Sequence, residues 1–369
     1  MDTNYQSSYW EQDSFLQPYD LIIVGAGIVG LSSALFYKRQ HPEARVAVLE
    51  RGFLPRGAST RNAGFACVGS ISEHLADMGK ESEENIKKRL FRRFNGLELL
   101  KKTLGEEAIG YRHTGGYELF TSHEKFERSA DEIDRFNGWM REMINEKEVY
   151  KADVLEGYPV IYNRLEGALH PGRMMQALSQ KVSEAGVEIK WNSSVERVTE
   201  DGVVSITDGP RLRSEKVLFA ANGFIPQLLS EIDIKPARGF VLVTDELENL
   251  PWKGIFHHDR GYIYFRNVGN RLLIGGARNL DVDGEQTDQF GTNEKIKNHL
   301  VGFASDVLKL PAGWQIHREW SGIMGFTSTK TPVVQRLDRS RYIAAGLSGM
   351  GIAIGMEVAN MAVDLLSMK

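Results

Sequence analysis

The sequence has a single cysteine, almost no net charge and no long uncharged run that is free of glycine. Cys67 alone cannot form an internal disulfide, so a disulfide framework is excluded and a reducing compartment is favoured. The 45 basic residues nearly balance the 49 acidic ones, which argues against a general nucleic-acid binder. The longest uncharged run, residues 21–37, is interrupted by three glycines, so we expect no integral membrane segment.

Other classes are also missing from the sequence. The first 17 residues contain three acidic side chains and no apolar run, so we expect no secretory signal and a cytoplasmic protein. Neither a P-loop nor the serine motif of the α/β-hydrolases is present. Glycine, in contrast, is abundant, at 37 of 369 residues against a usual share of about 7%. Since glycine permits tight turns and close backbone approach, its surplus suggests a backbone that must pass near a ligand.

The clearest motif is a glycine-rich turn between a strand and a helix. The aliphatic run 20–24 predicts a buried parallel strand, and residues 31–39 predict a helix. Between them lies a G-x-G-x-x-G motif, which reads Gly25-Ala26-Gly27-Ile28-Val29-Gly30. A second strand, 45–49, ends at Glu50, where a carboxylate can bind ribose hydroxyls and would repel a 2′-phosphate. This pattern predicts a dinucleotide site, but it does not separate FAD from NAD.

The polar loop that follows carries a family resemblance. It reads Glu50-Arg51, and then Gly57-Ala58-Ser59-Thr60-Arg61-Asn62-Ala63-Gly64. This loop resembles the flavin loop of the D-amino-acid oxidase superfamily of FAD enzymes, which includes glycine, sarcosine and gamma-glutamylputrescine oxidases. The resemblance covers nearly the whole chain, through residues 170–186, 187–199, 216–223 and 341–352.

The resemblance implies an α/β fold with two interleaved domains. A Rossmann-like FAD-binding domain would comprise residues 1–85, 155–235 and 331–369, and an α+β substrate domain with an antiparallel sheet would comprise 86–154 and 236–330. The family's cofactor contacts fall on Gly25, Gly27, Ile28, Val29, Gly30, Glu50, Arg51, Ala58, Ser59, Arg61, Asn62, Ala63, Gly64, Val195, Ala221, Asn222, Gly223, Gly349, Met350, Gly351 and Ile352. No cysteine occurs in residues 324–327, where sarcosine oxidase attaches its flavin, so we expect non-covalent FAD.

The substrate-facing residues are expected in two antiparallel strands, 261–266 and 270–278. Alternation along the first strand puts Tyr262, Tyr264 and Arg266 on one face. By the resemblance, Tyr262 matches the substrate tyrosine of glycine oxidase, and either tyrosine would orient the amine. Arg278 matches a residue that lines the same site, and two interpretations stay open: it holds a substrate anion, or it is a solvated charge at a strand end.

One departure from the family pattern concerns the substrate. The carboxylate-binding arginine of amino-acid oxidases falls on Met324, so a simple amino acid becomes a doubtful substrate. Together with Ser8-Tyr9-Trp10, this departure makes the pattern closest to gamma-glutamylputrescine oxidase. The resemblance implies that hydride passes from the amine carbon to flavin N5 and that the resulting imine is hydrolysed. The alternatives are a glycine or D-amino-acid type enzyme, an NAD-linked dehydrogenase, or a catalytically silent flavin protein. Leu273 stands where sarcosine oxidases have their oxygen-activating lysine, so the acceptor is oxygen or an unknown carrier.

Three further patterns yield expectations without a catalytic role. His257 and His258 point to opposite faces of a strand and Cys67 is far away in the chain, so we expect no metal site and a merely buried thiol. Residues 87–102 predict a docked helix with an apolar face of Ile86, Leu90, Phe94 and Leu97. The last helix is expected to show one side formed by Val358, Met361 and Leu365.

Overall fold

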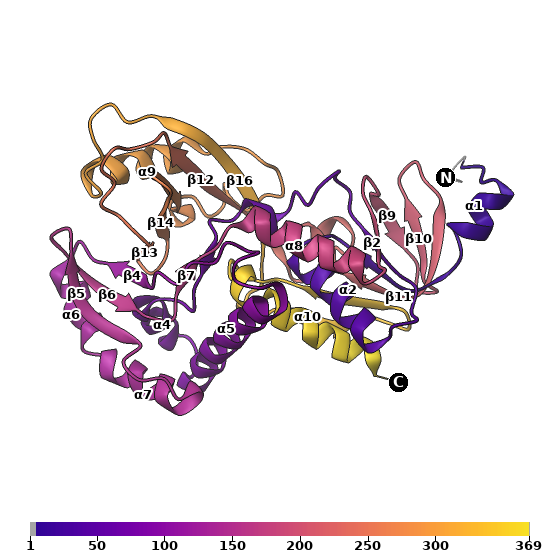
Figure 1. The fold of residues 1–369 in the computed structure, drawn as a ribbon, viewed down its shortest axis with the longest axis horizontal. Helices are drawn as coiled ribbons and strands as arrows, with labels where there is room; N and C mark the ends of the chain where they lie inside the picture. The colour runs from indigo at the N-terminus through magenta and orange to yellow at the C-terminus, as the bar shows by residue number, and fades with distance from the viewer. Residues whose placement is uncertain (1–4, 369) are drawn as a thin grey trace. The chain divides into compact units, whose positions relative to one another are not determined.

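The structure, a computed structural model, describes residues 5–368 and divides into two compact units. Among these residues, unit 1 is formed by 5–60, 172–237 and 323–368, and unit 2 by 61–171 and 238–322. Both units are therefore assembled from separate stretches of the chain, as the colours of Figure 1 show. Within the described residues, no helix combines the length and the apolar character that a membrane span requires.

Unit 1 is built on a largely parallel sheet. Its strand order is β17-β18-β11-β1-β2-β8, in which all pairs are parallel except β17 with β18, while β9 and β10 extend β11 as an antiparallel ribbon. The strands are β1 (Tyr19–Val24), β2 (Val46–Leu49), β8 (Glu188–Lys190), β9 (Val195–Val198), β10 (Val203–Ile206), β11 (Arg211–Phe219), β17 (Val333–Arg336) and β18 (Arg341–Ala345). The central strands are aliphatic because both of their faces are buried.

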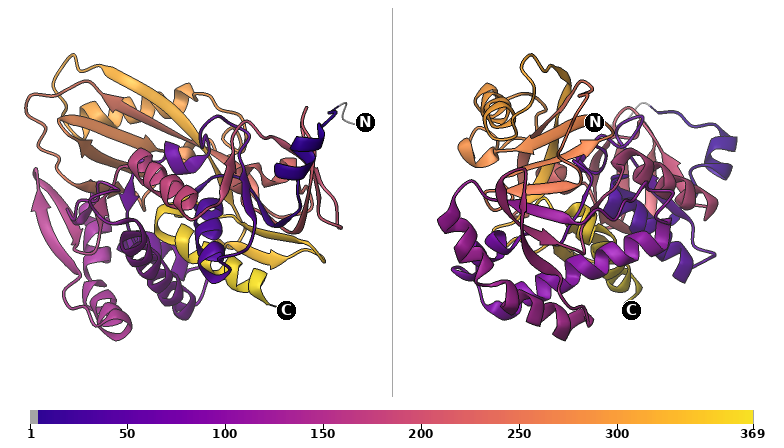
Figure 2. Two further views of the ribbon diagram at one scale, coloured as in Figure 1. Left: turned by 45° about the vertical axis from the view of Figure 1, so that its right-hand side comes forward. Right: turned by 60° about the vertical axis from the view of Figure 1, so that its left-hand side comes forward.

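The helices of this unit are α1 (Tyr9–Ser14), α2 (Ile28–Gln40), α3 (Ala58–Arg61), α8 (Pro171–Glu184), η1 (Asn222–Gln227) and α10 (Gly351–Ser367). Helices α2 and α10 lie side by side (Figure 1 and Figure 2). They approach closely at Gly355, where an added Cβ would lie 2.8 Å from the Ile28 side chain. The buried face of α10 consists of small and branched residues and includes Val358, but Met361 is 40% exposed. The expected side of Val358, Met361 and Leu365 is therefore not the buried face of α10.

Unit 2 is built on a mixed sheet with the order β16-β12-β15-β14-β13-β4-β6-β5. Strand β13 pairs with β4 in parallel, and β12-β15-β14-β13 and β4-β6-β5 pair antiparallel. The strands are β4 (Gly116–Leu119), β5 (Tyr150–Leu155), β6 (Tyr158–Asn163), β12 (Lys235–Thr244), β13 (Ile255–His258), β14 (Ile263–Val268), β15 (Arg271–Gly276) and β16 (Ile316–Phe326). A separate pair is formed by β3 (Phe65–Ala66) and β7 (Gly167–Ala168).

The helices of unit 2 are α4 (Ile71–Met78), α5 (Glu83–Leu104), α6 (His123–Ala130), α7 (Ile133–Ile144), η2 (Arg278–Leu280) and α9 (Glu294–Asp306). Ser82 caps the N-terminus of α5, because its side chain accepts a hydrogen bond from the Asn85 N–H, and the last turn of the helix contains Lys101 and Lys102. Its buried face contains apolar residues as expected, and also Arg93, which is 3% exposed and pairs with Glu73 at 3.0 Å. The sequence predicts that the charged side chains of this helix are solvated, and the ion pair explains why Arg93 is buried instead.

The units differ from the expected domains at their edges. Residues 61–85 and 155–171 cluster with unit 2, although we expected them in the FAD-binding domain, and residues 323–330 cluster with unit 1. The first difference has a physical reason in unit 2, since Arg266 on β14 donates to the Gly64 and Leu169 carbonyls, both at 2.9 Å. The expected functional boundaries of the two domains stay a prediction.

Candidate active site

The turn between β1 and α2 needs glycine at two positions. Gly25 has a φ of 109°, a left-handed conformation that disfavours other residues. A Cβ built on Gly30 would lie 1.9 Å from the Gly25 carbonyl oxygen, so only glycine lets the helix start against the strand. Gly27 is the N-cap residue of α2 and has no capping side chain, and the first turn of the helix has no acidic residue. This helix start therefore suits an anionic group such as a pyrophosphate.

Glu50 lies directly beside this glycine turn. Its carboxylate is buried and accepts hydrogen bonds from the Ala26 N–H and the Gly52 N–H, each at 3.0 Å. These two bonds hold the carboxylate at the carboxyl end of β2, where its remaining lone pairs can accept bonds from ribose hydroxyls. Ser59, from the expected flavin loop, also reaches the turn, because its Oγ accepts a bond from the Ile28 N–H at 3.0 Å.

The neighbours of Glu50 fix the start of the flavin loop. The Arg51 guanidinium stacks over the Phe224 ring at 3.9 Å and donates to the Gln227 side chain at 3.1 Å. Ala58 opens the short helix α3, and Val195 opens β9. The Glu50 carbonyl accepts a bond from the Ser193 N–H, two residues before Val195.

Two further turns of unit 1 are joined through Asn222. Its Oδ1 accepts hydrogen bonds from the Gly346 N–H at 3.0 Å and the Leu347 N–H at 3.3 Å, which links the end of β11 to the turn before α10. Gly223 packs against the Met324 carbonyl, which would lie 2.5 Å from an added Cβ. Ala221 is the N-cap residue of η1 and immediately precedes Asn222.

The start of α10 resembles the start of α2 in its chemistry. Gly349 has a φ of 85°, and Met350 is an N-cap residue without a side-chain hydrogen bond. Gly351 and Ile352 open the helix, whose first turn has no acidic residue. The carboxyl ends of β1, β2, β11 and β18 thus bring together two helix starts, three glycine turns and one buried carboxylate. These residues fit a dinucleotide with an anionic pyrophosphate and ribose hydroxyls.

The second half of the expected flavin loop, from Arg61 to Gly64, belongs to unit 2. The Arg61 guanidinium donates to the Ser321 carbonyl at 2.8 Å, and the Arg61 carbonyl accepts from the Trp320 indole at 3.0 Å. The Asn62 side chain accepts a bond from the Gly64 N–H at 2.8 Å and so closes a tight turn. Ala63 is buried next to Val241, Leu273 and Tyr264.

The two tyrosines expected on one face are separated in the structure. Tyr262 precedes β14 and is 44% exposed, so its expected place on the face with Tyr264 and Arg266 is wrong. The reason is that Gly261, with a φ of 78°, turns the chain just before the strand begins. Tyr264 packs against Phe65, with ring centroids 5.6 Å apart, and burial raises the pKa of its phenol to about 12.

The two arginines of this region differ in their partners. Arg266 is buried and donates to the Gly64 and Leu169 carbonyls, both at 2.9 Å, so it clamps the flavin loop rather than facing a substrate. Burial lowers its pKa to about 10. Arg278 opens η2 at the end of β15 and is half-buried, and burial lowers its pKa, while the nearby Tyr262 and Glu285 act in the opposite direction. The structure thus brings Arg278 near Tyr262, whereas Met324 belongs to unit 1.

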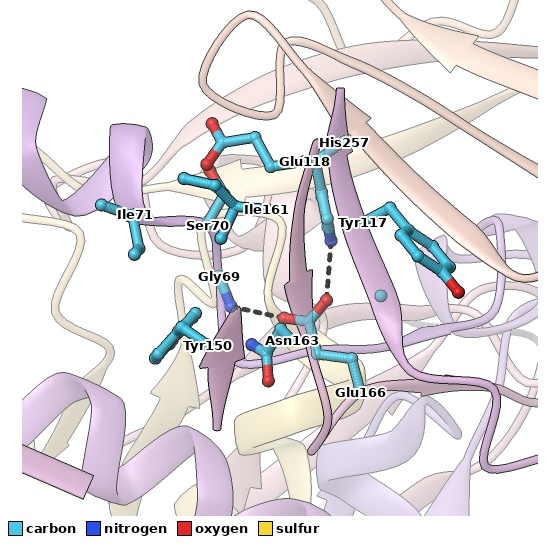
Figure 3. A pocket seen from close by; sticks show the side chains of 11 residues that line it. Gly69, Ser70, Ile71, Tyr117, Glu118, Tyr150, Ile161, Asn163, Glu166 and His257 are labelled. Carbon is cyan, nitrogen blue, oxygen red and sulfur yellow. Dashed lines mark hydrogen bonds and ion pairs between the residues drawn. The ribbon is translucent and has the colours of Figure 1, made fainter. Parts of the chain in front are cut away.

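A buried polar cluster in unit 2 was missed in the sequence. Cys67, Glu166 and His257 have ligand-type atoms within 4.8 Å of one another, which corrects the expectation that Cys67 lies far from the histidines. The pairing of β3 with β7 places Cys67 next to Glu166, and His257 on β13 bonds to Glu166 at 3.0 Å (Figure 3). No sequence signal could have revealed this, since the three residues come from distant segments with no motif spacing.

Comparison with known proteins identifies the family. A family model described as FAD dependent oxidoreductase (DAO) matches residues 20–365. The chain belongs to this family.

Two relatives and one solved structure illustrate this membership. Glycine oxidase from Geobacillus kaustophilus is 25% identical over 95% of this chain and 93% of its own length. Gamma-glutamylputrescine oxidoreductase from Escherichia coli is 25% identical over 94% of this chain and 83% of its own length. The crystal structure of the Geobacillus glycine oxidase superposes with a TM-score of 0.74 at 21% identity, covering 95% of this chain and 94% of that one.

Membership in the FAD-dependent oxidoreductase family confirms several expectations. The fold is an α/β FAD domain of the Rossmann type combined with a mostly antiparallel second sheet, and the cofactor is FAD. The alternative of an NAD-linked dehydrogenase is therefore wrong. The Gly25–Gly30 turn and Glu50 suit both dinucleotides, which is why the motif alone left the cofactor open.

Proposed function

We propose that this FAD-dependent oxidoreductase oxidises the carbon–nitrogen bond of a primary amine whose carboxylate lies far from the reacting carbon. The Escherichia coli relative is named gamma-glutamylputrescine oxidoreductase, and such a substrate has this arrangement. The product would be an imine, which water hydrolyses to an aldehyde and ammonia. Other relatives are named for different substrates, including a glycine oxidase and an L-2-hydroxyglutarate dehydrogenase. The choice of substrate therefore depends on the side chains of this chain.

The residues of unit 1 suit non-covalent FAD. The start of α2 would face the pyrophosphate, Glu50 would accept bonds from ribose hydroxyls, and the start of α10 would place a positive helix end near the flavin. Bound FAD supplies a two-electron acceptor, since its N5 takes hydride from the amine carbon. Cys67, the only cysteine in the sequence, is buried in unit 2 among protein groups, and it does not lie in the Met324–Thr327 stretch.

The observation that carries the substrate proposal is the side chain of Met324. Its sulfur lies beside the turn before α10, 3.8 Å from a Cβ built on Gly349. By the family resemblance, amino-acid oxidases have their carboxylate-binding arginine at this position. A thioether cannot pair with an anion, so burial of an α-carboxylate beside it would be penalised by several kcal/mol, on the order of the cost of an unpaired buried charge. This favours a substrate without a carboxylate on the reacting carbon.

The aromatic wall around Tyr264 supports an amine rather than an ammonium. Tyr264 packs with Phe65, Leu273 and Trp320 in one apolar cluster of unit 2. Apolar surroundings disfavour the charged form of an amine, and only the neutral amine can lose hydride from its carbon. Because burial raises the pKa of Tyr264 to about 12, its hydroxyl stays protonated and can orient the amine through a hydrogen bond.

Arg278 is the proposed partner of the distant carboxylate. It lies just after the end of β15, and although burial lowers its pKa, a guanidinium is charged in proteins. A guanidinium binds a carboxylate through two parallel hydrogen bonds, which gives both affinity and orientation. In this proposal Arg278 binds the acidic end of the substrate and Tyr264 the amine end.

A substrate panel tests the proposal directly. The purified yellow holoenzyme is mixed under anaerobic conditions with a gamma-glutamyl diamine, the free diamine, glycine, sarcosine, D-alanine and L-2-hydroxyglutarate, and flavin bleaching is recorded. We expect fastest bleaching with the gamma-glutamyl diamine. Faster reduction by glycine or by the hydroxy acid would refute the proposal, as would a flavin that dithionite reduces but no panel member does. Reoxidation of the bleached enzyme by oxygen, compared with an artificial quinone, then identifies the class of acceptor.

The role of Arg278 is tested by its replacement with methionine. For Arg278→Met, loss of a charge-assisted pair worth about 1.5–3 kcal/mol predicts a KM for the carboxylate-bearing amine that is about 10- to 150-fold higher. The KM for the free diamine should not change. The matched control is Arg271→Met, at the start of β15, where the guanidinium pairs with Asp245 at 3.4 Å; this variant should not affect either KM. An equal loss for both amines would refute a carboxylate contact.

A further inference from the structure

The buried cluster of Cys67, Glu166 and His257 has no role in the function proposed above. Cys67 is 7% exposed, Glu166 1% and His257 8%, and their ligand-type atoms lie within 4.8 Å of one another. A thiol, a carboxylate and an imidazole are the three side-chain types that zinc prefers in proteins. We propose that Cys67, Glu166 and His257 form a buried Zn²⁺ site in unit 2.

The geometry of the pair Glu166–His257 is already close to that of a zinc site. Its Oε2 and Nε2 atoms are 3.0 Å apart. Two such ligands at about 2.0–2.1 Å from zinc, in tetrahedral geometry, are separated by about 3.3 Å, and a sulfur at about 2.3 Å lies about 3.6 Å from each of them. The carboxylate and the imidazole therefore need to separate by only a few tenths of an ångström. Rotation of the Cys67 side chain can supply the remaining approach.

The surroundings of Glu166 hold it in one orientation. Its Oε1 accepts hydrogen bonds from the Val68 N–H at 3.0 Å and the Gly69 N–H at 3.1 Å, which leaves Oε2 directed at His257 (Figure 3). The His257 ring is also fixed, since Phe65 packs edge-on against it at 5.4 Å. Such second contacts, which orient a ligand before the metal arrives, are typical of zinc sites.

A water-sized cavity beside Glu166 and His257 offers the fourth position. Tyr150 and Asn163 also line it. Among the atoms of the described residues, the Tyr150 hydroxyl and the Asn163 Nδ2 are buried without a hydrogen-bond partner. Buried polar groups of this kind normally have a partner, and a water in the cavity would provide one. Bound to zinc, that water would complete a four-coordinate site with three protein ligands.

The charges balance with zinc bound. The thiolate of Cys67 and the carboxylate of Glu166 together neutralise Zn²⁺, and His257 binds as a neutral ring. Binding would therefore release the thiol proton and any proton on the imidazole to solvent. Without zinc, the same carboxylate and an imidazolium form a simple ion pair, which is the competing interpretation. The two interpretations differ in metal content and in the state of the sulfur.

The test uses the holoenzyme without an affinity tag, produced with zinc in the medium. We expect about one zinc ion per chain by mass spectrometry after dialysis against metal-free buffer. X-ray absorption at the zinc edge should show one sulfur at about 2.3 Å together with nitrogen or oxygen at about 2.0 Å. Protein that contains no zinc as purified, and takes up none during dialysis against Zn²⁺, would overturn the proposal. Bound zinc without a sulfur ligand would overturn it as well.

Variants locate the site. Cys67→Ala and His257→Gln should lose the zinc, and their flavin spectra report whether unit 1 is still folded. The matched control is His258→Gln, because His258 is the adjacent residue and its Nδ1 bonds to the Leu119 carbonyl instead. We expect His258→Gln to keep its zinc. Full zinc content in Cys67→Ala would refute the assignment, and if both site variants fail to fold, the absorption spectrum of the wild type still decides.

Discussion

The link that Asn222 makes between two cofactor turns permits a quantitative prediction. Its Oδ1 accepts hydrogen bonds from two buried residues, at 3.0 Å from the Gly346 nitrogen and 3.3 Å from the Leu347 nitrogen. Asn222 also has a φ of 46°, where glycine is unstrained. In Asn222→Gly the backbone conformation is therefore preserved, and only the acceptor is lost. The two N–H groups are then left unpaired.

Each lost hydrogen bond should cost about 0.5–1.5 kcal/mol, so Asn222→Gly should lower the free energy of unfolding by about 1–3 kcal/mol. At about 1.4 kcal/mol for each factor of ten, the unfolding constant rises about 5- to 150-fold. Asn222→Asp keeps an acceptor oxygen and should lose less. Asn222→Ala should lose more than the glycine variant, because alanine is strained at this φ.

The assay is urea unfolding of unit 1, followed by flavin fluorescence at one saturating FAD concentration, with unchanged slopes as the check on comparability. Asn192→Gly is the matched control: it also has a left-handed φ, of 55°, but an exposed side chain. The control should shift the unfolding free energy by only a few tenths of a kcal/mol. If Asn222→Gly is no less stable than Asn192→Gly, the inferred link between the turns is wrong.

Three further predictions concern the cofactor and the pH dependence of stability. Glu50→Gln keeps the shape of the side chain but loses its charge and one of the two oxygen acceptors that bind the Ala26 and Gly52 N–H groups. The affinity for FAD, measured by fluorescence titration, should therefore fall about tenfold. An unchanged affinity would exclude a contact between Glu50 and the ribose. Acid precipitation should release all flavin into the supernatant, and yellow pellets would contradict non-covalent binding. Burial lowers the pKa of His74 from 6.5 to about 4. Between these two pH values the unfolded state binds more protons than the folded state. The free energy of unfolding should therefore fall as the pH drops through that window, by up to about 3 kcal/mol. His74→Phe, which keeps the stacking on Phe136, should remove that part of the pH dependence in urea titrations, and an unchanged profile would assign it to other groups.

Much of unit 1 can be predicted because its information is local. The observed β1 and α2 agree with the expected 20–24 and 31–39 to within a few residues, since an aliphatic run, a glycine turn and a helix follow one another directly. Gly25, Gly30 and Glu50 lie where the spacing predicted, because carboxyl ends of adjacent parallel strands meet at one edge. Such a motif can be recognised in a sequence because the backbone conformation, rather than a particular side-chain contact, requires glycine at these positions.

The wrong expectations concern residues whose burial or orientation is decided by contacts and turns outside the local sequence pattern. Met361 is 40% exposed, whereas Gly355 of the same helix packs tightly against Ile28 of α2, and periodicity within α10 does not reveal which side makes that contact. Arg93 is buried on an apolar helix face, where Glu73 of another helix and the Val68 carbonyl both pair with its guanidinium. Tyr262 leaves the expected strand face because one left-handed glycine shortens β14. For Met361 and Arg93 a tertiary contact outweighs the local pattern, and for Tyr262 a turn in the chain does.

The cofactor and the substrate differ in how far a family match can identify them. The proposed FAD site consists mainly of helix starts and glycine turns, whose chemistry belongs to the backbone rather than to particular side chains, so a family match suffices to identify the cofactor. A substrate is recognised by individual side chains, and a single substitution at a position such as Tyr264, Arg278 or Met324 changes which charge can be paired. At about 25% identity, relatives can share the backbone cradle and differ at all three positions. The Met324 side chain therefore weighs more in the choice of substrate than the overall similarity to any relative, and the anaerobic panel is the experiment that separates the two.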